Sequence, residues 1–322
     1  MHAALVRELA PLGGERSATH RSFDSRFGPR WNWKTCLTHR LPGGLLVHRY
    51  EAGDGITISD RAAGCCAFVA PGPSPDAEYE PARLVRELLI ADLERRTAVP
   101  LHAGAVSLGG RGVLICGPRG AGKTTLICHL LEHAGADFVA NDRLFAVAGR
   151  RPRAVSWPWG IRIGLDTCAA SPALSRWLAG RRRLAYPQPG WDLEDPGRQP
   201  AGGGEAAKLE LTAAELAAAM GARVLGTVPV DLLVDLRYRT GHSEHTVEPL
   251  DPGVVAEDME RESEHVATDV YRDWLDLGLS SRGPVTPRGR EAVSALARGV
   301  PAVRLTYGDT GAAMCGLTSL LG

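Results

Sequence analysis

Long hydrophobic runs, excess charge and paired cysteine motifs are all missing from this 322-residue chain. No run approaches the roughly 18 apolar residues of a membrane span, and the start, MHAALVRELAPLGGERS, has no apolar core of signal-peptide length. Basic and acidic residues balance at 37 each, so net charge does not point to nucleic acid or to an anionic membrane surface. We therefore expect a cytoplasmic protein with no nucleic-acid and no membrane partner.

Cysteine and lysine usage adds two further constraints. The seven cysteines form no CxxC pair, and an odd number in a chain of this length argues against a disulfide framework. Of the 37 basic residues, only Lys34, Lys123 and Lys208 are lysines. Arginine does not replace lysine everywhere, because lysine is a compact point charge on a flexible stem. Each remaining lysine therefore gains some weight as a functional residue.

The chain divides into two regions by pattern. Residues 1–80 carry short alternating runs such as WNWKTCLTHR between glycine-rich turns, which predicts a small β-rich N-terminal domain. A proline-rich connector and a helical leucine stripe at 82–96 follow. From residue 101 strands and helices alternate, so we predict that 81–322 forms an α/β domain.

Residues 117–124, GPRGAGKT, match the pattern G-x-x-x-x-G-K-[ST] at every fixed position. An apolar strand precedes them and a helical run follows, as this motif requires. In such a loop backbone N–H groups turn inward around phosphate oxygens, and the helix N-terminus adds partial positive charge. Lys123 is expected to reach the β- and γ-phosphates, and the Thr124 hydroxyl to bind Mg²⁺. The alternative is a chance match in a glycine-rich chain.

The motif predicts ATP and Mg²⁺ as ligands. The residues expected to bind the nucleotide are Gly117, Arg119, Gly120, Ala121, Gly122, Lys123, Thr124 and Thr125.

Gly109-Gly110, just before this loop, indicates a two-residue hairpin turn. Such a turn pairs Val106 with Val113 and would put His102 opposite Gly117. An imidazole beside the γ-phosphate could orient a nucleophile or move a proton. The alternative is a strand-end histidine that only bonds the backbone.

The stretch LHAGAVSLGGRGVLICGPRGAGKTTL, followed by VANDRLFAV, resembles the catalytic core of the HPr kinase/phosphorylase family and its smaller HPr-kinase-like relatives. The resemblance spans residues 101 to about 165. It implies an α/β fold with a P-loop core related to phosphoenolpyruvate carboxykinase, next to the small β-rich N-terminal domain. In that family a histidine precedes the hairpin, and His102 stands in its place. An acidic pair ends the next strand as catalytic base and magnesium contact, but here the pair reads Asn141-Asp142.

By this resemblance the protein is an ATP- and Mg²⁺-dependent kinase of a hydroxyl group on a peptide or small molecule. Asp142 and His102 are the implied catalytic residues, and Thr124 and Asp142 the implied metal ligands. HPr itself is not expected as the substrate, because the motifs that engage it are not located. Relatives commonly assemble, so a homo-oligomer is possible. Asn141 leaves two readings: Asp142 does both jobs, or the base is lost and the protein binds nucleotide without efficient transfer.

Several assignments stay open. Asp235 in DLLVDL competes with Asp142 for the metal, or is a strand-end acid in solvent. Lys208 either closes over the phosphates or is a solvated strand-edge lysine, and Arg162 either enters the cleft or forms a structural salt bridge. Residues 186–206 are expected to form a mobile loop or lid, and the acidic helix near 255–275 an exposed face. The alternative functions are an NTP hydrolase and a nucleotide-sensing binding module.

Overall fold

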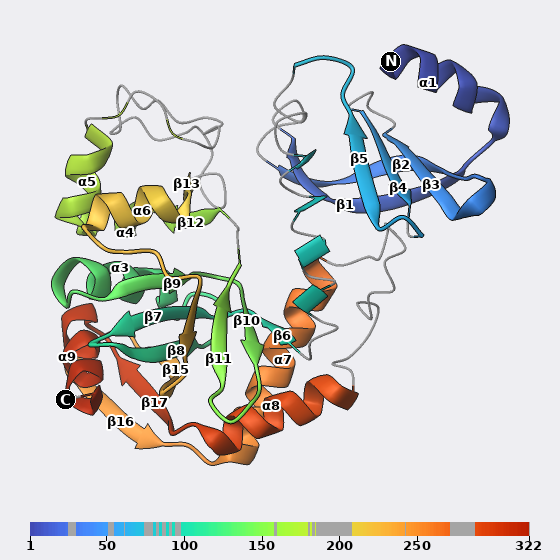
Figure 1. Cartoon of the computed structure of the whole chain (residues 1–322). Helices are drawn as coiled ribbons and strands as arrows, with labels where there is room; N and C mark the ends of the chain where they lie inside the picture. Colours follow the sequence, from blue (N-terminus) through green and yellow to red (C-terminus); the bar gives the residue numbers. More distant parts are fainter. Residues whose placement is uncertain are drawn as a thin grey trace. The chain divides into compact units, whose positions relative to one another are not determined.

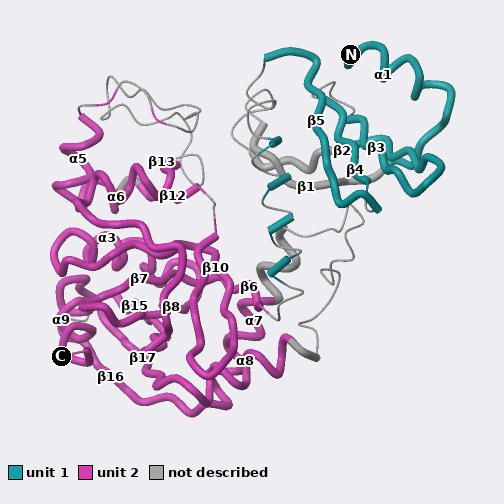
Figure 2. The backbone as a smooth tube through the Cα atoms, viewed as in Figure 1, with its two compact units in different colours: residues 1–95, 268–283 teal, residues 96–267, 284–322 magenta. Residues whose placement is uncertain are grey.

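The computed structural model forms two compact units (Figures 1 and 2), one of residues 1–95 with 268–283 and one of residues 96–267 with 284–322. Along the chain, unit 1 first gives way to unit 2 between Arg95 and Arg96, whereas the sequence suggests a domain boundary at residue 80. The residues that the structure describes are 1–24, 30–50, 55–60, 62–73, 80–81, 84–85, 88–89, 92–93, 98–157, 160–179, 181, 184, 208–241, 243–270 and 287–321.

Within its described residues, unit 1 is an antiparallel sheet of order β1-β2-β3-β4-β5 with a helix at its start. Apolar residues of one sheet face, Val47, Ile56 and Val69, pack with Leu9 of the helix into a small core. These strands occupy the region where alternation predicts a β-rich domain. The elements are His2–Leu9 (α1), Ala10–Leu12 (η1), Glu15–Asp24 (β1), Arg30–Arg40 (β2), Pro42–Gly44 (η3), Leu45–Tyr50 (β3), Ile56–Asp60 (β4) and Cys65–Val69 (β5).

Unit 2 is a mixed α/β structure built on a central sheet of order β16-β17-β15-β8-β7-β9. Strands β15 and β17 run parallel to β8, whereas β7 is antiparallel to both β8 and β9. Consequently β8, β9, β15 and β17 all end at the same edge of the sheet. The bounds are Gly104–Leu108 (β7), Arg111–Cys116 (β8), Asp137–Ala140 (β9), Leu232–Tyr238 (β15), His245–Pro249 (β16) and Ala302–Tyr307 (β17).

Helices cover both faces of this sheet. Val113 and Ile115 of β8 belong to one core cluster with α3, α6 and α9, whereas Leu114 and Cys116 belong to another with α7 and α8. Side chains along a strand alternate between faces, so the continuous apolar run of β8 supplies both cores. The helices are Lys123–His133 (α3), Ala213–Met220 (α6), Pro252–Val270 (α7), Pro287–Gly299 (α8) and Thr310–Leu321 (α9).

A second sheet of order β14-β11-β10-β6 is antiparallel throughout. The chain passes directly between the two sheets at residues 102–103 (β6 to β7), at residues 141–143 (β9 to β10) and at residues 230–231 (β14 to β15). The first passage begins after Leu101 of β6 and the second ends before Leu144 of β10, and these two residues lie opposite each other. His102 and Asp142 are therefore brought together where the sheets join. The strands are Ala98–Leu101 (β6), Leu144–Val147 (β10), Arg153–Ser156 (β11) and Thr227–Pro229 (β14).

A two-stranded sheet and two short helices complete the described part of unit 2. Strand β12 (Ile161–Gly164) pairs with β13 (Lys208–Leu211), and α4 (Leu165–Ala170) and α5 (Pro172–Ala179) follow β12. The expected lid, residues 186–206, lies outside the described residues. Within the part of the chain that the structure describes, none of the helices combines the length and apolar character that a bilayer span needs.

Candidate functional site

The hairpin before the loop has the predicted turn and register, but His102 is not part of it. Gly109 and Gly110 have φ of 59° and 81°, which fits a type I′ turn, and Val106 pairs with Val113. The ladder ends at Gly104 opposite Ile115, because residues 98–101 pair with β10 in the second sheet. The expected position of His102 opposite Gly117 is therefore wrong.

The glycine-rich segment 117–122 connects β8 to α3, and two neighbouring strands hold it closely. A Cβ on Gly117 would lie 2.5 Å from the carbonyl oxygen of Leu236 in β15. A Cβ on Gly122 would lie 2.1 Å from Oη of Tyr307 in β17, whose hydroxyl donates a hydrogen bond to the carbonyl of Ala121 at 2.9 Å. Sequence reasoning missed Tyr307, which ends a strand far along the chain. The glycines are needed here for space as well as for backbone conformation.

Replacing Gly122 with alanine should destabilise the protein more than the same change at Gly120. Both residues have a positive φ, 82° and 83°, so each alanine costs about 1 kcal/mol of backbone strain. Only the Gly122 variant also meets Tyr307, which is 1% exposed and cannot swing away, so we expect a further loss of about 2 kcal/mol. Urea unfolding of both variants measures the difference. Equal losses would contradict this account of the loop.

Lys123, the first residue of α3, folds back into the loop. Its Nζ donates to the carbonyl oxygens of Gly117 at 2.6 Å and Pro118 at 3.4 Å, and the residue is 8% exposed. Burial lowers the pKa of Lys123, although the negative charges of Glu262 and Asp142 act in the opposite direction. The loop thus contains a buried amine at the position where the motif predicts contact with phosphate.

The next two threonines link the loop helix to neighbouring elements. The Thr124 hydroxyl donates to Oδ1 of the buried Asn141 at 3.1 Å. Thr125 shares a hydrogen bond of 2.8 Å with the hydroxyl of Thr167 in α4. Asn141, the departure from the acidic pair, therefore lies directly beside the predicted metal ligand and offers it an amide oxygen.

His102 lies between two carboxylates. Its Nε2 is 3.0 Å from Oδ1 of Asp142, and its Nδ1 is 3.1 Å from Oε2 of Glu262 in α7. The side chains of His102 and Glu262 are 14% and 16% exposed, whereas that of Asp142 is 46% exposed. Among the described residues, Asp142 is also the one non-glycine residue with positive φ, 71°. Such an outlier costs energy and is typical of functional sites.

The contacts of His102 determine its protonation state. Ionised carboxylates only accept hydrogen bonds, so both ring nitrogens must donate, which requires the imidazolium form. Burial would lower the pKa of His102, but the hydrogen bonds to Asp142 and Glu262 raise it above 6.5. Burial would raise the pKa of Asp142, but the hydrogen bond and charge of His102, with Arg143 and Lys123, hold it well below its usual range. These contacts favour an ion pair between the His102 imidazolium and the Asp142 carboxylate.

Glu262 corrects the expectation that the acidic helix near 255–275 is an exposed face. It lies 160 residues from His102 in sequence, so no local pattern could reveal the contact. Glu257 on the same helix does face solvent.

A Glu262→Gln substitution should lower the pKa of His102, and Glu257→Gln should leave it unchanged. A raised pKa stabilises the folded state fully below the unfolded value of 6.5, and this contribution is lost as pH rises through the folded pKa. The Glu262→Gln variant should therefore lose stability below pH 6.5 relative to wild type, and the gap should close at higher pH. Histidine NMR titration and urea unfolding across pH measure both effects. An unchanged His102 titration would show that Glu262 does not hold the ring protonated.

Asp235, the rival metal ligand, is buried and already paired. Its Oδ2 accepts from Nε of Arg237 at 3.0 Å and from Nε of Arg304 at 2.8 Å. It is therefore not a solvated strand-end acid, and its Oδ2 is engaged by two arginines.

The other candidates lie on the two-stranded sheet. Lys208 is half-buried in β13 opposite Gly164, and Arg162 of β12 lies opposite Glu210. This sheet is separate from the two sheets that join at His102.

A magnesium ion has suitable oxygen atoms near Thr124. Its hydroxyl, the Asn141 amide and the Asp142 carboxylate are the hard ligands that Mg²⁺ prefers, and such a site completes its shell with water and phosphate. Among the described residues, no group of three or more His, Cys, Asp or Glu side chains is arranged to hold a metal.

Comparisons with known proteins add little. No protein-family model and no curated protein matches the sequence. Among solved structures, the chain is similar to the Hpr(Ser) kinase/phosphatase from Coxiella burnetii, with 10% identity and a TM-score of 0.30 over 69% of this chain and 93% of that chain. A TM-score this low carries no argument about function.

Proposed function

We propose that unit 2 is an ATP- and Mg²⁺-dependent kinase with an HPr-kinase-like P-loop core, which transfers the terminal phosphoryl group to a hydroxyl. The observation that carries this proposal is the joining of two features. The GPRGAGKT segment begins helix α3 with a buried lysine, and the next residue, Thr124, bonds to Asn141, whose neighbour Asp142 pairs with His102. Phosphoryl transfer requires this combination of positive charge at the phosphates and a base near the acceptor.

In the proposed mechanism, the loop amides and the start of α3 bind the β- and γ-phosphates. Lys123 exchanges its carbonyl contacts for phosphate oxygens, which are better partners for an ammonium group. Thr124, Asn141 and Asp142 supply oxygens for Mg²⁺, whose charge offsets that of the phosphates. Lys208, the first residue of β13, is a proposed additional contact to the phosphates.

Asp142 is the proposed base for the acceptor hydroxyl. His102 cannot serve as a base in its imidazolium form, so its proposed roles are to orient Asp142 and to add positive charge beside the transferring group. Asn141 then stands in the place of the first acid of the family pair. Its neutral amide oxygen accepts the hydrogen bond from Thr124 or binds the metal. This division leaves one carboxylate where the family pattern has two.

The proposal is tested by incubating the protein with Mg²⁺, γ-labelled ATP and hydroxyl-bearing acceptors, both serine peptides and small molecules. Label on an acceptor supports the kinase. Label in inorganic phosphate alone would replace it with an NTP hydrolase. Asn141 favours a second candidate, a nucleotide-sensing module, for which ATP would bind and no label would move.

A further inference from the structure

A cavity of about 530 Å³ adjoins the loop on the side opposite to Asp142. In the order β17-β15-β8-β7-β9 the loop follows β8, Asp142 follows β9, and this cavity is formed by the loop and the ends of β15 and β17. Its volume falls in the usual range for small-molecule sites, about 300–1,000 Å³. It is therefore large enough for a ligand group that extends away from the proposed catalytic pair.

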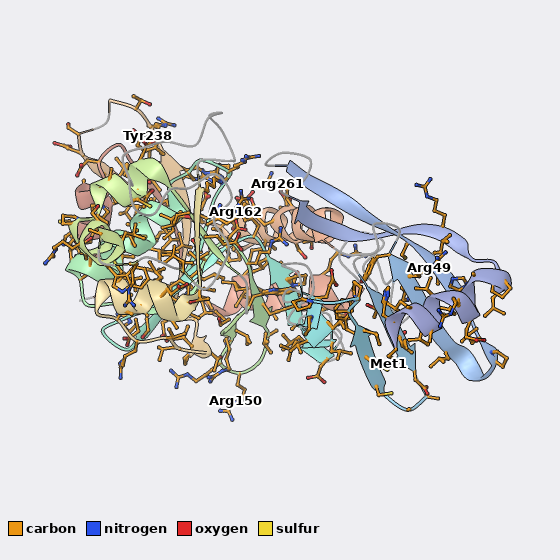
Figure 3. The ribbon with its side chains drawn as sticks, turned by 90° about the horizontal axis from the view of Figure 1, so that it is seen from above. Met1, Arg49, Arg150, Arg162, Tyr238 and Arg261 are labelled. Carbon is orange, nitrogen blue, oxygen red and sulfur yellow. The ribbon has the colours of Figure 1, made fainter. Side chains whose placement is uncertain are left out.

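Positive charge dominates the wall of this cavity. Arg119 of the loop, Arg237 and Arg239 at the end of β15, and Arg304 of β17 line it, and none of the described lining residues is Asp or Glu. Tyr238 also lines the cavity and is 49% exposed. This residue is labelled in Figure 3. Guanidinium groups that line one cavity repel each other, and an anion bound among them lowers that repulsion.

The buried Asp235 holds two of these arginines side by side. It is 4% exposed and accepts from Nε of both Arg237 and Arg304, which lie on adjacent strands. Oδ2 of Asp258 also lies 3.8 Å from an Nη of Arg237, so acids behind the cavity offset part of its positive charge. The pair is thus held in place by a buried acid while the wall keeps an excess of positive charge, an arrangement suited to phosphate, which arginine binds through two parallel hydrogen bonds.

We propose that this arginine cavity is a second phosphate site, which adjoins the phosphate grip of the loop and shares loop residues 119–121 with it. Its phosphate belongs either to the nucleoside side of the bound nucleotide or to a separate phosphorylated molecule. In the first case the attached base can stack on Tyr238. The positive charge of the cavity does not depend on the proposed kinase activity, whereas the binding of a nucleotide phosphate in it rests on that proposal.

Calorimetric titration with inorganic pyrophosphate tests the site. Wild type should bind two pyrophosphates per chain, and Lys123→Met should retain only the cavity site. Arg239→Ala should weaken the cavity site about tenfold, because Arg239 is exposed and its removal takes away a charged hydrogen bond without disturbing the core. Arg150→Ala is the matched control, since Arg150 extends into solvent from the turn between β10 and β11 (Figure 3).

One pyrophosphate per wild-type chain, or Arg239→Ala behaving like Arg150→Ala, would overturn the proposal. ATP then separates the two sources. If the nucleotide supplies the phosphate, saturating ATP displaces both pyrophosphates and Arg239→Ala weakens ATP about tenfold. If a separate molecule supplies it, ATP displaces only one and Arg239→Ala leaves ATP binding unchanged. Failure of the kinase proposal would be visible separately, as ATP binding that Lys123→Met does not alter.

Discussion

A Lys123→Met variant is expected to bind Mg²⁺-ATP about 100-fold more weakly than wild type, since it loses charge-assisted hydrogen bonds to phosphate. Methionine keeps most of the volume of the buried lysine, so the change removes charge without opening a large cavity. The Nζ of Lys123 already lies 2.6 Å from the Gly117 carbonyl oxygen inside the loop, which is the position from which it would reach a phosphate. Equilibrium binding with labelled ATP measures the effect.

The control for this variant is Arg150→Ala, which removes one positive charge from an exposed turn. Its ATP affinity should match that of wild type, and the melting temperatures of all three proteins should confirm that Lys123→Met is folded. A folded Lys123→Met protein with wild-type ATP affinity would mean that nucleotide does not bind at residues 117–124.

An Asp142→Asn variant is expected to lose turnover by about 10³-fold and to keep its ATP affinity within a few-fold of wild type. The amide cannot accept a proton from the acceptor hydroxyl, but it leaves the loop and Lys123 in place. It also removes one of the two charges that hold His102 protonated, so the pKa of His102 should fall. Single-turnover transfer rates and ATP affinities, measured on the same preparation, separate the two effects.

Asp166→Asn, the same carboxylate-to-amide change at an exposed position of α4, should leave the transfer rate unaltered. If Asp142→Asn transfers phosphoryl groups at the wild-type rate, then Asp142 is not the base. If wild type itself shows no transfer and Asp142→Asn changes only metal affinity, the nucleotide-sensing alternative replaces the kinase.

Features coded by neighbouring residues could be predicted from the sequence. The Gly109-Gly110 turn sets its own register, because residues with positive φ fit the twist of the two strands. The apolar strand, the glycine-rich segment and helix α3 follow each other directly along the chain, and the mixed α/β architecture follows from the alternation of elements.

The side-chain contacts within the site could not be predicted, because they depend on packing between elements that lie far apart in the sequence. The turn alone predicts His102 in the hairpin, but the pairing of Leu101 with Leu144 draws the preceding strand into another sheet. Glu262 meets His102 only because α7 packs on the sheet face that carries Leu114 and Cys116. For the same reason no local pattern could show that Asp235 is taken up by two arginines.

The most direct test of the proposed site is a crystal structure of the protein with Mg²⁺ and a non-hydrolysable ATP analogue. The account predicts that the β- and γ-phosphates lie against the amides of residues 117–123, with Lys123 Nζ bonded to them and the Asp142–His102 pair beside the γ-phosphate. A nucleotide bound elsewhere, or bound at the loop with Asp142 and His102 turned away from its terminal phosphate, would contradict it.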